Sequence, residues 1–235
     1  MPHTNSIILI VAGILFFLHL ISETLASFIK YNFSSIGKHM QGVSFSNIFG
    51  IASRGFISLY GVVAAVVIEK KYSDVFSYSL VMSMVLFFSS YISYFYSNKK
   101  ISRKSINETK KNISLISDVF FKKLDKNDTE SAVKIKGVVS VFLGVQFVAI
   151  VVAYGFCFLM PDRRLFIISL VPLVGMLGTM ATVVLVEPRL AIMIDMENST
   201  GFAASKEFLR ARAISFAFSA LLIAFFPFGM KFIFN

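Results

Sequence analysis

Two ionisable residues interrupt stretches of the sequence that are otherwise apolar. Glu23 lies in the apolar stretch 7–31, and Arg54 lies in the stretch 43–68. A charged side chain at the centre of a membrane-spanning helix costs at least about 2.5–3.5 kcal/mol, so it persists where a partner charge or a water-filled cavity offsets that cost. His19 lies one helical turn before Glu23, on the same helix face. These residues predict either a structural ion pair between two helices or a polar groove in which Arg54 binds an anion. Charges inside a membrane favour the groove.

A second group of charged residues follows the apolar stretch 165–186. Its members are Glu187, Arg189, Asp195 and Arg210. Arginine side chains bind phosphate oxygens in a bidentate manner, so this group is a second candidate for binding an anion. Arg210 and Arg212 are two positions apart and do not share a helix face, so only one of them is expected to point into a site. We interpret Arg212 as an anchor on the positively charged side of the membrane and keep Arg210 as the candidate.

The stretches that carry these residues have the length and composition of membrane-spanning helices. The 235-residue chain is 56% apolar and has a mean hydropathy of +0.76, whereas soluble domains contain about 45–50% apolar residues. A helix of about 20 apolar residues crosses a bilayer, and these stretches lack the alternating pattern of barrel strands. We therefore predict a single all-α, polytopic membrane domain over residues 1–235. Its six transmembrane helices are expected at 7–31, 43–68, 75–97, 137–160, 165–186 and 208–232.

The positive charges are divided unevenly between the two sides of this predicted bundle. Most of the 23 Lys and Arg residues lie in the connections after the first, third and fifth helices, above all in the loop 98–136. The positive-inside rule places that side in the cytoplasm and both termini outside. The net charge of +10 then reflects topology and attraction to anionic membrane lipids. Nucleic acid is not an expected partner, because the basic residues are not interleaved with aromatic ones.

Two connections have structural consequences. The connection between the stretches 7–31 and 43–68 is short, so these two helices are expected to be neighbours. The basic loop 98–136 fits either an amphipathic helix lying on the inner leaflet or a solvated linker whose lysines set the topology.

The sequence lacks the common signatures of enzymes and of metal sites. It contains no GxxxxGK[ST] motif for nucleotide phosphates and no HExxH or GxSxG hydrolase motif. Cys157 is the single cysteine, so neither an internal disulfide nor a CxxC site can form. We predict no catalytic residues, no metal and no cofactor, and a transporter rather than an enzyme.

Three short motifs of the sequence belong together: Ser22-Glu-Thr-Leu-Ala26, Asn47 with Ser53-Arg54, and Val186-Glu-Pro-Arg-Leu-Ala-Ile-Met-Ile-Asp195. They resemble motifs of the Amj family, the alternate flippases for lipid II in bacterial cell-wall synthesis. The resemblance covers most of the chain, including the six helices, but the loop 98–136 has no counterpart in it. It implies a multi-pass protein of the bacterial cytoplasmic (inner) membrane. The implied substrate is lipid-linked: undecaprenyl-pyrophosphate carrying the disaccharide-pentapeptide, which moves from the inner to the outer leaflet.

The resemblance does not assign substrate-binding residues, so the roles of the charged residues are our hypothesis. Arg54, with Arg189 or Arg210, would receive the pyrophosphate, and Glu23 and Asp195 would pair with those arginines or contact sugar and peptide groups. Glu187 and His19 complete the candidate set. Two other classes of function stay open: a non-transporting scaffold whose basic loop recruits a cytoplasmic partner, and an ion-coupled carrier of a small solute. The sequence also leaves open whether the chain forms a homo-oligomer.

Overall fold

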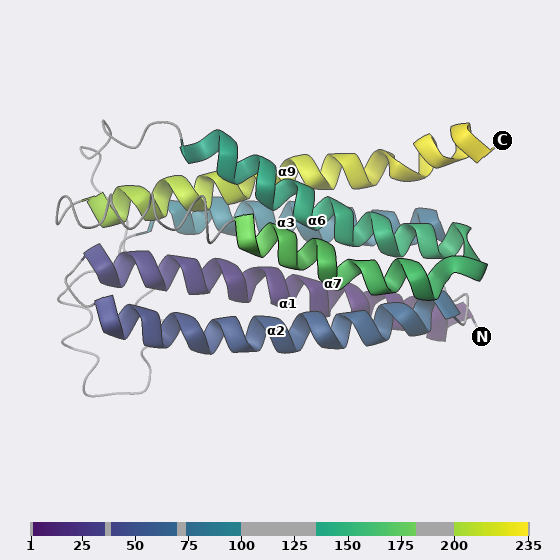
Figure 1. Ribbon diagram of the computed structural model, residues 1–235, viewed down its shortest axis with the longest axis horizontal. Helices are drawn as coiled ribbons and strands as arrows, with labels where there is room; N and C mark the ends of the chain where they lie inside the picture. The colour runs from purple at the N-terminus through teal and green to yellow at the C-terminus, as the bar shows by residue number, and fades with distance from the viewer. Residues whose placement is uncertain (1, 36–38, 70–73, 100–134, 182–199, 235) are drawn as a thin grey trace.

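The computed structural model shows a bundle of helices that run alongside one another (Figure 1). It describes residues 2–35, 39–69, 74–99, 135–181 and 200–234. The all-α prediction is confirmed for these residues, which form six α-helices and one short 3-10 helix. These elements are α1 (Pro2–Ser35), α2 (His39–Glu69), α3 (Val75–Ser97), α6 (Ile135–Leu159), η2 (Pro161–Arg163), α7 (Arg164–Ala181) and α9 (Thr200–Phe234).

Four of the six α-helices are long and apolar enough to cross a membrane. The candidate spans are Ile7–Phe33, Gln41–Glu69, Val75–Ser97 and Lys206–Gly229. They coincide with four of the stretches predicted from apolar length. The other two predicted helices overlap α6 and α7, and the apolar part described in α6, Gly144–Leu159, is shorter. Spans at α6 and α7 therefore stay predictions, and most of the basic loop 98–136 lies outside the described residues.

Local sequence signals set the start of α3 and the turn between α6 and α7. The Asp74 carboxylate accepts a hydrogen bond from the Ser77 N–H (2.6 Å), which satisfies a free amide at the first turn of α3. Pro161 opens η2, where its fixed φ angle and missing N–H fit the first position of a helix. The chain then turns back, and α7 packs against α6.

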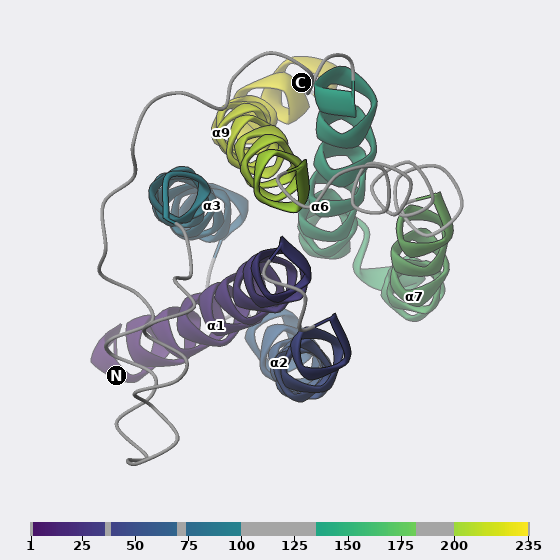
Figure 2. The same cartoon turned by 90° about the vertical axis from the view of Figure 1, so that its left-hand side faces the viewer.

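Helices α1 and α9 form the centre of the packing. α1 contacts α2, α3 and α9, and α9 also contacts α3 and α6. By contrast, α2 packs against α1 and reaches α6 at few positions, and α7 packs mainly against α6. Viewed end-on, α2 and α7 accordingly lie at the periphery (Figure 2). The extensive contact between α1 and α2 confirms that these helices are neighbours, as their short connection predicted.

Polar contacts between helices and an apolar exterior suit this bundle to a bilayer. The Ser83 hydroxyl donates to the Ala220 carbonyl (2.9 Å), and the Ser90 hydroxyl donates to the Ala213 carbonyl (2.7 Å), so α3 is hydrogen-bonded to α9. Serines at such contacts let helix backbones approach and add hydrogen bonds where lipid offers none. Large apolar side chains on α2, α3 and α9 are exposed, as a lipid-facing surface requires.

Candidate functional site

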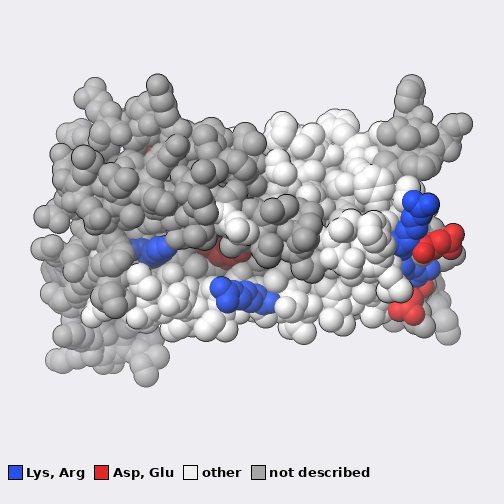
Figure 3. All heavy atoms as spheres, viewed as in Figure 1, with Lys and Arg blue, Asp and Glu red and all other residues white. Residues whose placement is uncertain are grey.

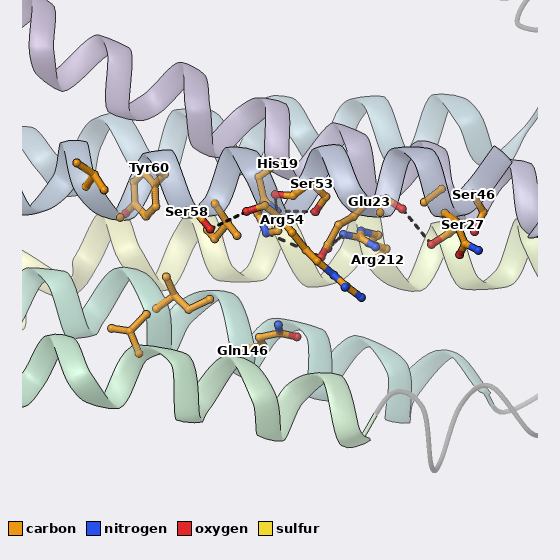
Figure 4. Close-up of a pocket in the computed structure, with 18 of the residues that line it drawn as sticks. His19, Glu23, Ser27, Ser46, Ser53, Arg54, Ser58, Tyr60, Gln146 and Arg212 are labelled. Atoms are coloured by element: carbon orange, nitrogen blue, oxygen red, sulfur yellow. Dashed lines mark hydrogen bonds and ion pairs between the residues drawn. The ribbon is translucent and has the colours of Figure 1, made fainter. Parts of the chain in front are cut away.

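A cavity of about 910 Å³ lies between the α1–α2 pair on one side and α6, α7 and α9 on the other. It exists because α2 leans on α1 and leaves most of its other flank without a helix neighbour among the described residues. Its lining is charged and hydroxyl-bearing around the middle of α1, and more aromatic and aliphatic towards Tyr60 and Tyr154. Figure 4 shows this order, with Tyr60 and Ser46 on opposite sides of the charged residues.

The deepest charge in the cavity is an ion pair between α1 and α9. Arg212 Nη2 donates to Glu23 Oε2. The Arg212 side chain is 4% exposed, whereas the Glu23 side chain is 32% exposed. The Arg212 guanidinium also lies over the Phe216 ring, with Cζ 5.2 Å from its centroid, a contact that favours a cation. A buried guanidinium needs such partners, because an unpaired charge away from water costs several kcal/mol.

His19 connects this ion pair to α2. Its Nδ1 lies 2.8 Å from Ser53 Oγ and 3.2 Å from the Ser53 carbonyl oxygen. Its Nε2 lies 3.9 Å from Glu23 Oε1. Because a carbonyl oxygen only accepts, Nδ1 carries the proton, and in a neutral imidazole Nε2 then turns an acceptor lone pair towards Glu23. The histidine is thus held in one tautomer beside the carboxylate.

Arg54 brings a second guanidinium to the cavity, and no described residue forms an ion pair with it. Its side chain is exposed and lines the cavity. Its backbone carbonyl accepts from Ser58 Oγ (2.9 Å), but within the described part of the chain its guanidinium has no hydrogen-bond or ion-pair partner. Figure 4 shows the guanidinium extending from α2 towards the side on which Gln146 of α6 lies. This group can therefore bind an anion without first breaking an ion pair.

Charged atoms reach the surface at the middle of the bundle as well as at its ends. Figure 3 views the face that carries α2 and α7. Basic and acidic atoms appear there about half-way along the molecule, beside white atoms and beside the grey atoms of residues that are not described. In a membrane, that position corresponds to hydrocarbon depth. A charged group is tolerated there when it faces a cavity that water or a polar headgroup can enter.

The structure brings together three of the seven residues predicted for the site. Glu23, His19 and Arg54 line one cavity. The partner of Glu23 is Arg212 on α9, so the structural pair considered between Glu23 and Arg54 does not form in this structure. Arg210 contacts Glu207 Oε1 (3.8 Å) and Asn98 Oδ1 (3.4 Å) and is not part of the described lining. The remaining candidates, Glu187, Arg189 and Asp195, lie outside the described residues.

Arg212 is the site residue that sequence reasoning missed. The positive-inside rule already accounts for an arginine near the start of the last helix. A role of Arg212 in the cavity was therefore not considered. The signal that could have found it is spacing, because Phe208, Arg212, Ser215 and Ser219 recur three or four positions apart. All four are buried on the inner face of α9. The pattern was weak because apolar residues surround this helix on every face.

Comparisons with protein-family models, with characterised proteins and with solved structures find no match to this chain. Among the residues the structure describes, no group of three or more His, Cys, Asp or Glu side chains is placed to hold a metal ion. The geometry of the cavity is therefore the basis on which a function is argued.

Proposed function

We propose that this chain is a membrane transporter that moves the headgroup of the lipid-linked peptidoglycan precursor lipid II from the inner to the outer leaflet. Motifs in α1 and α2 of this chain resemble those of the Amj family, whose members have this activity. The observation that carries the proposal is the Arg54 guanidinium, which extends into a 910 Å³ cavity with no partner among the described residues. A guanidinium without a partner inside the bundle adds nothing to the stability of the protein. Its presence there is better explained by binding of an anionic substrate.

The shape of the cavity suits a substrate that is part polar and part lipid. Sites that enclose drug-sized molecules measure about 300–1,000 Å³, so there is room for a pyrophosphate and an adjoining sugar. The lipid tail needs no enclosure, because it can stay in the bilayer beside the exposed apolar side chains of α2, such as Ile51 and Leu59. The polar headgroup alone has to be kept out of hydrocarbon.

The proposal includes a topology. Six transmembrane helices with both termini outside would place the basic loop 98–136 and the charged end of the cavity on the cytoplasmic side of a bacterial inner membrane. Lys30 lines the cavity near the last turns of α1, which would put a positive charge at the entrance used by an anionic headgroup. Anionic lipids would gather at the same side.

Residues of the lining can then be given roles. Arg54 would bind the pyrophosphate bidentately, which is the contact that arginine makes best. Asn47 and Gln146 also line the cavity and can exchange hydrogen bonds with sugar groups. Arg210 is not needed for this arrangement, since its side chain contacts Glu207 and Asn98.

Growth of a bacterium depleted of its usual lipid II flippases tests the proposal. Wild-type protein should restore growth, and Arg54→Ala at matched membrane levels should not. Losing one charge-assisted contact worth about 2 kcal/mol lowers binding roughly 30-fold. Arg163→Ala is the matched control, because Arg163 is an exposed arginine at the turn between α6 and α7. Full growth with Arg54→Ala would remove Arg54 from the mechanism, and failure of the wild type to restore growth would remove lipid II as the substrate.

The same strain separates transport from a scaffold role. Deleting residues 105–127 takes away most of the basic loop and leaves all the described helices intact. A transporter core should keep its activity without this segment, whereas a scaffold that recruits a cytoplasmic partner through the loop should lose it.

A further inference from the structure

Arg212 belongs to the same cavity as Arg54, but its charge is already occupied. It lines the cavity from α9, and its Nη2 donates to Glu23. Its Nε is buried and has no hydrogen-bond partner within the described residues. A guanidinium has five N–H donors in a fixed fork, so this one keeps donor capacity beyond its contact with Glu23. Arg212 is therefore paired with Glu23 and has further N–H groups with which it could bind a ligand.

Glu23 is the single carboxylate that faces these cations in the described structure. His19 on α1 and Arg212 on α9 contact it, and Arg54 on α2 and Lys30 on α1 line the same cavity. The third helix that packs against α1 is α3, which contributes the Ser93 hydroxyl, bonded to Thr24 (3.2 Å), and has no charged residue. With these three cations, one carboxylate and a neutral imidazole, the cavity has two net positive charges. Protonating Glu23 would raise this to three.

A proton can reach Glu23 from the cavity. The Glu23 side chain is 32% exposed, although the arginine it holds is buried. The Nε2 lone pair of His19 is directed at the same carboxyl group, 3.9 Å away, because Ser53 fixes the imidazole through Nδ1. A protonated carboxyl in this place would have an acceptor close by, which lowers the cost of keeping it neutral in the bundle.

We propose that Arg212 is a second phosphate-binding group of the cavity, which Glu23 holds in an ion pair until Glu23 takes up a proton. The inference rests on the proposed function and specifies how the same site binds a doubly charged phosphate ester. When the anion enters at Arg54, one proton moves from solvent to the Glu23 carboxylate, and the hydrogen bond from Arg212 to Glu23 breaks. Arg212 then donates to a phosphoryl oxygen. Release of the anion reverses both steps, so one proton binds for each anion bound.

Binding of lipid II to the purified full-length protein in detergent micelles tests the inference. Lipid II is the right probe, because its pyrophosphate is esterified at both ends and does not itself titrate near neutral pH, unlike a terminal phosphate. Between the pH at which Glu23 titrates in the free protein and the higher pH at which it titrates in the complex, uptake of one proton makes the affinity fall about tenfold for each unit of rising pH. The dissociation constant should therefore rise about a hundredfold between about pH 6 and about pH 8.

Replacing the carboxylate separates Glu23 from other titrating groups. Glu23→Gln resembles the protonated state, so this variant should bind lipid II as tightly as the acidified wild type and change less than about twofold over the same pH range. Glu69→Gln is the matched control, since Glu69 is exposed at the end of α2 and does not line the cavity. It should keep the wild-type pH dependence. A Glu23→Gln variant with the wild-type slope would overturn the inference and point to His19.

A measurement on the wild type makes the outcome independent of whether the variant folds. Calorimetric titration in two buffers with different heats of ionisation counts the protons taken up for each lipid bound. The expected count is about one at about pH 7.5, and a count of zero would overturn the inference while leaving the proposed function intact. No binding of lipid II at any pH would instead overturn both.

Discussion

At the scale of single residues, the charges inside the bundle differ in what they can do. The Arg212–Glu23 pair joins α1 to α9 and buries a guanidinium, so it contributes to stability whatever its other role. Arg54 contributes little of that kind, because no described residue accepts from its guanidinium. A charge that is costly at this depth and adds no contact is best explained by binding. Arg212 thus combines a structural role with the second phosphate contact proposed for it, whereas Arg54 has a ligand-binding role alone.

Removing Arg212 should destabilise the protein by leaving Glu23 without its partner. Breaking a fully buried pair costs about 3–5 kcal/mol, and the partial exposure of Glu23 lowers the expectation for Arg212→Ala to about 2 kcal/mol. The double variant Glu23→Ala with Arg212→Ala should recover part of this loss, because neither charge is then left alone. Thermal unfolding in detergent measures all three variants in a double-mutant cycle. Strictly additive losses would show that the two side chains do not stabilise each other.

The residue scale also shows what the sequence could and could not predict about the site. Glu23, His19 and Arg54 were identified because each interrupts or faces an apolar stretch, where polarity needs a reason. Arg212 was not, because it lies close to the basic end of its helix, where an arginine already has an explanation. Arg212 and Glu23 lie 189 positions apart in the chain, so their pairing depends on which helices are in contact. Apolar periodicity does not determine these contacts.

At the scale of the elements, close approach between α1 and α2 depends on one glycine. A Cβ atom at Gly42 would lie 2.6 Å from Phe33 Cβ and 3.2 Å from the Lys30 carbonyl oxygen, both on α1. Small residues at such crossings let membrane helices approach closely enough for van der Waals contact to hold them together. Because α2 has few other neighbours, the position of the cavity wall that carries Arg54 depends on this contact.

Gly42→Ala should therefore separate the ends of α1 and α2 at a cost of about 1–3 kcal/mol, which is typical of overpacking. Gly55→Ala is the matched control on the same helix, because a Cβ there would meet nothing within 4 Å. That substitution should be neutral or stabilising by up to about 1 kcal/mol, since alanine favours a helix over glycine. Midpoints of thermal unfolding compare the two variants, and equal effects would contradict the role given to Gly42.

At the scale of the whole molecule, apolar length predicted the helices well and their arrangement poorly. Runs of about 20 apolar residues gave the helices at α1, α2, α3 and α9 because bilayer thickness fixes that length. The short connection between α1 and α2 predicted that these two helices are neighbours. The contact of α3 with α9 did not, since these helices are far apart in the chain and lie together because of serine hydrogen bonds and side-chain fit.

The proposed topology can be tested in intact cells. Cys157 is the single cysteine and is buried, so Cys157→Ser gives a background without thiols. In that background, Lys71→Cys should react with a membrane-impermeant maleimide added outside, and Lys104→Cys should react after permeabilisation only. This outcome follows from the larger number of basic residues on the side of the loop 98–136. Labelling of Lys104→Cys from outside, with labelling of Lys71→Cys after permeabilisation only, would invert the topology and place the charged end of the cavity outside.

The most direct test of the central claim, that Arg54 binds the headgroup while it crosses the membrane, is translocation of labelled lipid II by purified protein in liposomes. The fraction of lipid II that becomes accessible in the opposite leaflet is followed over time, with a labelled small solute in parallel vesicles. The account predicts that the wild type and Arg163→Ala move lipid II at the same rate and that Arg54→Ala is slowed roughly 30-fold. Undiminished movement of lipid II by Arg54→Ala, or transport of the solute in place of the lipid, would contradict it.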